Sequence, residues 1–216
     1  MVEAKEKRET SEQIPKIIRP MKPVKVETLP KNESDWISEI KWDGARAIVY
    51  TNRNLQQFQI QSSSGRNVSQ QFPEFFKGFS TLAKRHSLII DGELIFKDGK
   101  SGTRKKVISR LNSSPPIGDL ELNPMRCSFI ALDILYVDGA DLKSTPLAKR
   151  KKILERVLTS KFQDKYGEIG VTAYWETNHQ KVIDFTKTQG FEGIVLKRKD
   201  STYHQGQSNR WLKIKF

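Results

Sequence analysis

The chain has 216 residues, 36% of them hydrophobic, which is enough to bury a core in one large domain or two small ones. No apolar run approaches the roughly 20 residues that cross a bilayer, and the charged start MVEAKEKRETSEQ is unlike a secretory signal. We therefore expect a cytoplasmic protein with no membrane partner. The net charge of +13 indicates a polyanionic partner, and nucleic acid is favoured over an anionic membrane because no strongly amphipathic basic helix is found.

The sequence offers no metal or redox site based on sulfur or imidazole. The single cysteine, Cys127, excludes an internal disulfide and a Cys-rich zinc site, and its apolar surroundings predict a buried small side chain. The histidines are scattered without metal-ligand spacing.

The N-terminal half is predicted to consist mainly of strands. Residues 1–18 are expected to be a charged, proline-containing, disordered tail before one domain at 19–216. Four prolines make 14–30 extended, so regular structure is expected to begin near Trp36. The strand patterns WISEIKW and ARAIVYT flank Asp-Gly at 43–44 and predict a hairpin over 36–51. QQFQIQ predicts a half-exposed strand, and Pro73 begins a helix with apolar positions through Ala83.

In the C-terminal half, helices alternate irregularly with strands. SLIIDGELIF and CSFIALDILYV predict buried strands, and 113–124 predicts a loop. Two further helices are expected, one beginning at Pro146 and one between Asn178 as N-cap and Gly190 as stop. GIVLKR and WLKIKF predict closing strands. The pattern favours an α+β fold with largely antiparallel sheets and flanking helices over a doubly wound parallel sheet.

Three groups of residues could carry chemistry, and each also has a structural interpretation. Lys41 lies before the Asp-Gly turn in EIKWDGAR, and a nucleophilic lysine needs burial or nearby cations. Taken alone, this pattern favours an edge-strand lysine before a hairpin turn over a nucleophile. Asp91 and Glu93 point to one side of an apolar strand, with Gly92 leaving space, so a ligand or cation could satisfy them; a plain turn is the alternative. Lys213 and Lys215 share a strand face that could bind phosphate or simply be solvated.

Taken in order, the motifs resemble the covalent nucleotidyltransferase family of ATP-dependent DNA ligases, RNA ligases and capping enzymes. They are KWDG at 41–44, DGE at 91–93, EGIVLK at 192–197 and KIK at 213–215. The stretches EIKWDGAR, QQFPEF, ALDILYVDG and KRKDSTYHQGQSNRWLKIK are most similar to the bacterial end-joining DNA ligases. The likeness covers roughly residue 20 to the end, and it implies the ligase adenylation fold.

The resemblance implies a role for each matching residue. Lys41 would attack the α-phosphate of ATP, expel pyrophosphate and retain AMP, which would pass to a DNA 5′-phosphate before the nick is sealed in repair or end joining. The substrate would be nicked or broken double-stranded DNA, bound near the nucleoid. The other expected roles are adenine recognition by Glu39, nucleotide orientation by Arg46 and Glu93, Mg²⁺ (alternatively Mn²⁺) placement by Glu192 and Glu93, and phosphate contact by Lys197, Lys213 and Lys215.

Three departures from the family pattern qualify these expectations. Ser63 stands where the family places an arginine, and Arg66 could substitute for it from a shifted register. Leu132 stands where many members stack an aromatic ring on adenine. The sequence ends at Phe216, before the oligonucleotide-binding (OB) barrel that follows in the family, which fits an excised domain, a natural minimal protein or a degenerate one. Without the barrel, slow self-adenylation and weak DNA binding are expected, and a partner could supply an OB domain or an end-joining function.

Two alternatives to an active DNA ligase stay open. One is an impaired ligase-like module that binds DNA or nucleotide and needs a partner. The other is an RNA ligase or a capping-type nucleotidyltransferase, which substrate comparisons would separate.

Overall fold

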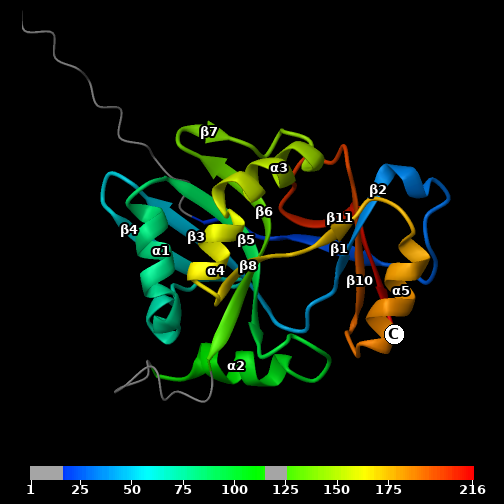
Figure 1. The fold of residues 1–216 in the computed structure, drawn as a ribbon, viewed down its shortest axis with the longest axis horizontal. Helices are drawn as coiled ribbons and strands as arrows, with labels where there is room; N and C mark the ends of the chain where they lie inside the picture. Colours follow the sequence, from blue (N-terminus) through cyan, green and yellow to red (C-terminus); the bar gives the residue numbers. More distant parts are fainter. Residues whose placement is uncertain (1–16, 115–125) are drawn as a thin grey trace, which may run out of the picture.

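The computed structural model describes residues 17–114 and 126–216, which form two mixed sheets with helices on their outer sides (Figure 1). The first sheet has the strand order β1-β11-β10-β2-β9, and the second has β4-β3-β5-β6-β7, with β8 added to β6. All pairings are antiparallel except β1 with β11 and β6 with β8. Neither sheet closes into a barrel within the described residues, so the predicted α+β class with largely antiparallel sheets is confirmed. The strands are β1 (Met21–Lys25), β2 (Trp36–Ile40), β3 (Ala45–Asn52), β4 (Gln57–Ser62), β5 (Leu88–Phe96), β6 (Cys127–Val137), β7 (Ala140–Asp141), β8 (Ile169–Val171), β9 (Tyr174–Trp175), β10 (Gly193–Arg198) and β11 (Gly206–Lys215).

Five α-helices in the described part of the chain cover the sheets. Helix α1 (Phe76–Ala83) packs on β3 and β4, and α5 (His179–Thr188) packs on β10 and β2 at the opposite side of the molecule (Figure 1). Helix α2 (Arg104–Asn112) lies against β5 and β3, α3 (Leu147–Val157) against β6, and α4 (Ser160–Lys165) against β8. Short 3-10 helices lie at Glu33–Asp35, Ser69–Gln71 and Pro73–Phe75.

Alternation along the central strands produces three apolar cores. In β3, Val49 faces the core beneath α1, whereas Ile48 faces the core between the two sheets. The inter-sheet core also contains Ile37 and Trp211 from the first sheet, so it joins the sheets. A third core lies between the first sheet and α5. Cys127 is buried in the first core, and burial raises the pKa of its thiol to about 12, as expected for an inert small side chain.

The predicted hairpin over 36–51 is wrong. Strands β2 and β3 belong to different sheets, and residues 41–44 carry the chain from one sheet to the other. A two-residue hairpin turn needs positive φ, which Gly44 does not adopt. The Asp43–Gly44 pair instead contacts the start of α2.

Regular structure begins earlier than expected. The proline-rich stretch contains β1, which accommodates Pro23 at the edge of the first sheet beside a register shift. Ile18 is already buried, and its backbone N–H donates to the Tyr50 hydroxyl at 3.0 Å. The expected tail at 1–18 and the loop at 113–124 lie mostly outside the described residues.

In the described part of the chain, no helix is both long and apolar enough to span a membrane.

Candidate active site

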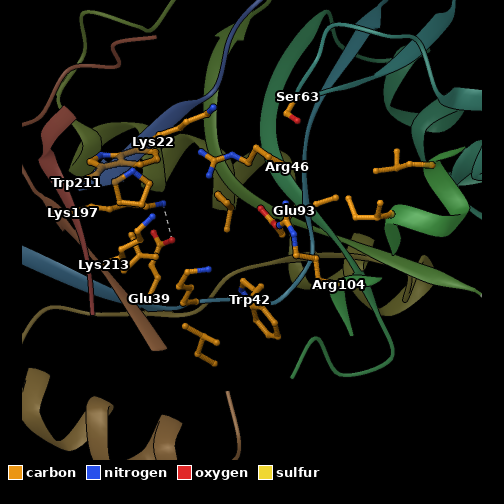
Figure 2. A pocket seen from close by; sticks show the side chains of 18 residues that line it. Lys22, Glu39, Trp42, Arg46, Ser63, Glu93, Arg104, Lys197, Trp211 and Lys213 are labelled. Atoms are coloured by element: carbon orange, nitrogen blue, oxygen red, sulfur yellow. Dashed lines mark ion pairs between the residues drawn. The ribbon is translucent and has the colours of Figure 1, made fainter. Parts of the chain in front are cut away.

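A cavity of about 340 Å³ lies between the two sheets, and both contribute to its walls (Figure 2). Figure 2 shows Glu39, Lys197, Lys213 and Trp211 on the side of the first sheet, and Arg46, Glu93 and Arg104 on the side of the second. The crossing at 41–44 places Lys41 and Trp42 between them. The lining residues are Lys22, Pro23, Glu39, Ile40, Lys41, Trp42, Ala45, Arg46, Ser63, Glu93, Arg104, Ile108, Leu111, Leu132, Val195, Lys197, Trp211 and Lys213.

Lys41 is held at the end of β2 by contacts with the segment that begins β10. Its backbone N–H donates to the Gly193 carbonyl at 2.9 Å, and its Nζ donates to Glu192 Oε2 at 2.5 Å. Lys215 Nζ donates to the other oxygen of the same carboxylate. Burial opposes ionisation of Glu192, but the hydrogen bonds from Lys215 and Lys41 outweigh it and hold the pKa below its usual range. The motifs at 41–44 and 192–197 are therefore physically joined.

The Asp-Gly pair after Lys41 anchors the start of α2. Asp43 Oδ2 accepts hydrogen bonds from the backbone N–H groups of Gly102 and Arg104 at 2.7 and 3.3 Å, which satisfies donors at the helix start. The Asp43 N–H donates to the Gly99 carbonyl at 2.9 Å. A Cβ on Gly44 would lie 2.0 Å from the Leu94 carbonyl oxygen, so no side chain fits there. This local geometry explains the residue types at 43 and 44.

Glu39 is buried between two lysines. Its Oε1 lies 2.5 Å from Lys151 Nζ, and its Oε2 lies 2.7 Å from Lys197 Nζ. Although these ion-pair distances are short, Glu39 Oε1 and Lys197 Nζ have no well-oriented hydrogen-bond partner among the described residues, so both keep capacity for a ligand. Burial lowers the pKa of Lys197 to about 8, with Glu39 opposing the shift and Lys151 adding to it.

Strand register aligns the polar groups of the first sheet. Val195 of β10 lies opposite Glu39 of β2 on one side and opposite Lys213 of β11 on the other. Burial lowers the pKa of Lys213, and the nearby Lys41 and Lys215 lower it further. The pairing of β2, β10 and β11 thus brings residues from three distant motifs to one wall.

The second sheet contributes one satisfied carboxylate and one available carboxylate. Asp91 is fully buried and accepts Arg46 Nε at 2.5 Å, Arg46 Nη2 at 2.6 Å and the Tyr203 hydroxyl at 2.6 Å. Glu93 has no ion pair within the part of the chain that the structure describes. Burial raises its pKa to about 7, although Arg46, Lys41 and Arg104 oppose this shift. A cation or hydroxyl of a ligand would stabilise its ionised form.

Gly92 separates these carboxylates for a reason other than the predicted one. A Cβ there would lie 2.3 Å from the Phe129 ring on the core side of the sheet. The space is therefore filled by the core, not reserved for a ligand, while Asp91 and Glu93 face the other way as expected.

The cavity gathers most of the residues predicted from sequence. The predicted residues that line it are Glu39, Lys41, Arg46, Glu93, Leu132, Lys197 and Lys213. Glu192 lies outside the lining and pairs with Lys41, and Lys215 in turn pairs with Glu192. Ser63 also lines the cavity. The guanidinium of Arg66 instead donates to the Leu111 carbonyl and to Asn112 Oδ1, so the idea that Arg66 replaces a pocket arginine is not supported.

Four charged or aromatic residues of the site lie outside the motifs and were not predicted from the sequence. Lys22, Arg104 and Trp211 line the cavity, and Lys151 holds both Glu39 and the Leu132 carbonyl, the latter at 2.9 Å. Lys22 was missed because the prolines around it disguised its segment as a non-strand in the sequence. Lys151 was missed because it belongs to the run KRKK, in which no local signal distinguishes it from its neighbours.

No three His, Cys, Asp or Glu side chains converge as a metal site within residues 17–114 and 126–216. Mg²⁺ commonly uses one or two carboxylates together with substrate phosphates and water. Glu93 in the cavity and Glu192 beside it fit a cation shared with a phosphate ligand better than a cage made by protein alone.

The comparison with known families decides the identity of the domain. The model of the family described as ATP dependent DNA ligase domain matches residues 14–215. The chain belongs to this family. The nucleotidyltransferase fold and the resemblance to DNA ligases are thereby confirmed.

Individual relatives of this ligase domain include bacterial and archaeal proteins. The multifunctional non-homologous end joining protein LigD of Mycolicibacterium smegmatis is 32% identical over 183 residues, which are 83% of this chain and 21% of that protein. A DNA ligase of Thermococcus onnurineus is 30% identical over 94% of this chain and 37% of its own length. The chain thus spans well under half of these curated relatives.

Among solved structures, the ligase domain is similar to mycobacterial DNA ligase D complexed with ATP and MES. The TM-score is 0.72 at 26% identity, over 92% of this chain and 60% of that one. The ligase domain of LigD from M. tuberculosis gives a TM-score of 0.70, also at 26% identity, over 92% of this chain and 59% of that one.

Proposed function

We propose that this ligase domain attaches AMP covalently to Lys41 and transfers it to the 5′-phosphate of nicked or broken double-stranded DNA. The observation that supports this most strongly is the position of Lys41 in an inter-sheet cavity beside Lys197, Lys213 and Glu93. The similar mycobacterial DNA ligase D binds ATP, which a cavity of this kind also suits. As in LigD, the biological role would be end joining in DNA repair, with an OB domain or an end-joining protein as partner.

The first step needs the Lys41 amine in its neutral form. Lys41 Nζ would form a bond to the α-phosphorus as the bond to the pyrophosphate oxygen breaks, and the ammonium proton would leave to solvent. In the structure the Lys41 ammonium is paired with Glu192. Glu192 would orient the Lys41 side chain through this contact and, with Glu93, would hold Mg²⁺ or Mn²⁺, which when bound would supply charge neutralisation at the phosphates.

The remaining residues would orient the nucleotide and stabilise its charge. Lys197 and Lys213 line the same cavity as Lys41, so we assign them to the α-phosphate. Glu39 would read the adenine amino group, and Arg46 with Glu93 would hold the ribose. Leu132 would pack on the base, and Lys215 would keep Glu192 in place. In the later steps a DNA 3′-hydroxyl would displace AMP and seal the strand.

Covalent labelling tests this function. We expect the parent chain, incubated with Mg²⁺ and ATP labelled in the α-phosphate, to retain label after denaturation, whereas Lys41→Ala retains none. Lys41→Arg should also fail, because a guanidinium stays protonated and cannot attack phosphorus. Thermal melting of both variants controls for folding.

Label on Lys41→Ala at the parent level would contradict the proposal. Nicked DNA offered against nicked RNA, and ATP against GTP, would separate a DNA ligase from the RNA ligase and capping-type alternatives. A parent that takes no label but binds nicked DNA would favour the impaired binding module.

A further inference from the structure

The cations of the cavity divide into paired and unpaired groups. Lys41, Arg46 and Lys197 each form an ion pair with a carboxylate. Lys22, Arg104 and Lys213 line the same cavity, and none forms an ion pair within residues 17–114 and 126–216. An unpaired cation facing a cavity is available to an anionic ligand.

Arg104 is the most firmly placed of the unpaired cations outside the expected motifs. Its Nη1 donates to the Gly44 carbonyl, and its backbone N–H donates to Asp43. Thr103 Oγ1 adds a hydrogen bond of 2.8 Å to the Asp43 carbonyl. The turn that follows Lys41 therefore fixes where this guanidinium lies.

The remaining donors of Arg104 have no protein partner in the described structure. One of its five N–H groups is used by Gly44, whereas Arg46 uses Nε and Nη2 on Asp91. Figure 2 shows Arg104 beside Glu93, yet the two form no ion pair. A planar guanidinium with unused donors matches the oxygens of a phosphate group.

We propose that Arg104 binds a terminal phosphate of the substrate, which is either the β,γ-phosphates of ATP or the 5′-phosphate at a DNA nick. This inference rests on the proposed function but concerns a residue outside the four motifs. Anchoring by Asp43 and Gly44 would keep the bound phosphate in register with Lys41. The Asp43 carboxylate occupies the N–H groups at the start of α2, so the phosphate would be bound by the Arg104 guanidinium and not by the helix N-terminus.

Equilibrium binding tests the proposal without requiring transfer of AMP. The ligands are α,β-methylene ATP, which carries all three phosphates but resists transfer, and AMP, which lacks the outer two. Nicked duplexes with a 5′-phosphate or a 5′-hydroxyl form the second pair. Each is measured by calorimetry with the parent, Arg104→Ala, Arg104→Lys and the control Lys105→Ala, which changes an exposed neighbour on α2 that does not line the cavity.

We expect Arg104→Ala to weaken one phosphate-bearing ligand about tenfold and to leave its phosphate-poor counterpart unchanged. A loss confined to α,β-methylene ATP assigns Arg104 to the nucleotide, and a loss confined to the 5′-phosphate nick assigns it to DNA. Arg104→Lys should retain part of the affinity, and Lys105→Ala nearly all of it.

Two outcomes would overturn the proposal. One is unchanged affinity for every ligand. The other is an equal loss for AMP and α,β-methylene ATP, or for both nicks, because Arg104 would then act only through Glu93 or the Lys41 turn. Since these readouts precede chemistry, they remain informative even if Lys41 proves not to be labelled.

Discussion

At the scale of single residues, Glu93 makes the stability of the fold depend on pH, because its carboxylate is half-buried and has no ion pair in the described structure. Its pKa is raised from an ordinary 4.5 to about 7. A carboxylate whose pKa is higher in the folded protein stabilises the fold at low pH and loses that contribution as pH rises through the folded value. Glu93→Gln should therefore match the parent near pH 4 and exceed its stability above pH 7.

The expected gain for Glu93→Gln at pH 8 is about 2 kcal/mol, because raising the pKa from 4.5 to about 7 corresponds to roughly 3 kcal/mol before allowance for partial exposure. Urea denaturation at pH 4.5, 6 and 8 measures it. A variant less stable than the parent at pH 8 would show that the Glu93 carboxylate is satisfied by its surroundings.

The motifs predicted which residues belong to the site, but not why particular residue types occupy positions 43 and 44. The sequence places Asp43 and Gly44 in a turn, yet only the structure shows that Asp43 anchors α2 and that Leu94 excludes a side chain at 44. Arg104 and Lys151 were missed because a basic residue in a basic run carries no local sign of facing a cavity. Their importance depends on contacts made across more than 50 residues of sequence.

At the scale of elements, one buried ion pair fastens α3 to β6. Arg150 Nε and Nη2 donate to the two oxygens of Asp133 at 2.9 and 2.8 Å, and both side chains are fully buried. Arg150 Nη1 also donates to the carbonyls of Ser201 and Thr145. Arg150→Ala would leave the Asp133 charge buried without its partner, so it should cost about 3–5 kcal/mol.

The midpoint of urea unfolding would report this loss, with Lys149→Ala as the matched control, since Lys149 is exposed on the same helix. An effect of Arg150→Ala no larger than that of Lys149→Ala would refute the anchoring role.

Helices and strands were predicted correctly where the apolar residues follow only one pattern, either that of a helix or that of a strand. The strands at β5 and β6 and the helices α1, α3 and α5 follow their apolar patterns. The hairpin failed because alternation on both sides of an Asp-Gly pair is common to a hairpin and to two strands that enter different sheets. Strand β1 was missed because Pro23 within it and Pro20 just before it lower strand propensity, while an edge position beside a register shift tolerates Pro23.

At the scale of the whole molecule, the cavity exists because the chain crosses between two sheets at Lys41. The order of the motifs along the sequence predicts which residues form the site. The pairing of β2 with β10 and of β10 with β11 then determines that Glu39, Val195 and Lys213 lie side by side. Such long-range register cannot be read from local patterns, so the sequence predicts membership of the site better than its geometry.

The chain has 38 basic and 25 acidic residues, and the resulting net positive charge is a property of the whole molecule that should affect DNA binding. If the basic surface neutralises about four DNA phosphates, the released counterions give a slope of roughly −3.6 for log affinity against log salt, or about a hundredfold loss of affinity between 50 and 200 mM salt. Fluorescence anisotropy with a labelled nicked duplex measures this, and a second duplex of unrelated sequence should give the same slope because phosphate contacts carry no sequence information. AMP, whose binding neutralises far fewer phosphates, serves as the control and should show a much flatter dependence. Affinity for nicked DNA that stays constant over this range would mean that the positive charge is merely solvated surface, and that binding depends on uncharged contacts around the cavity.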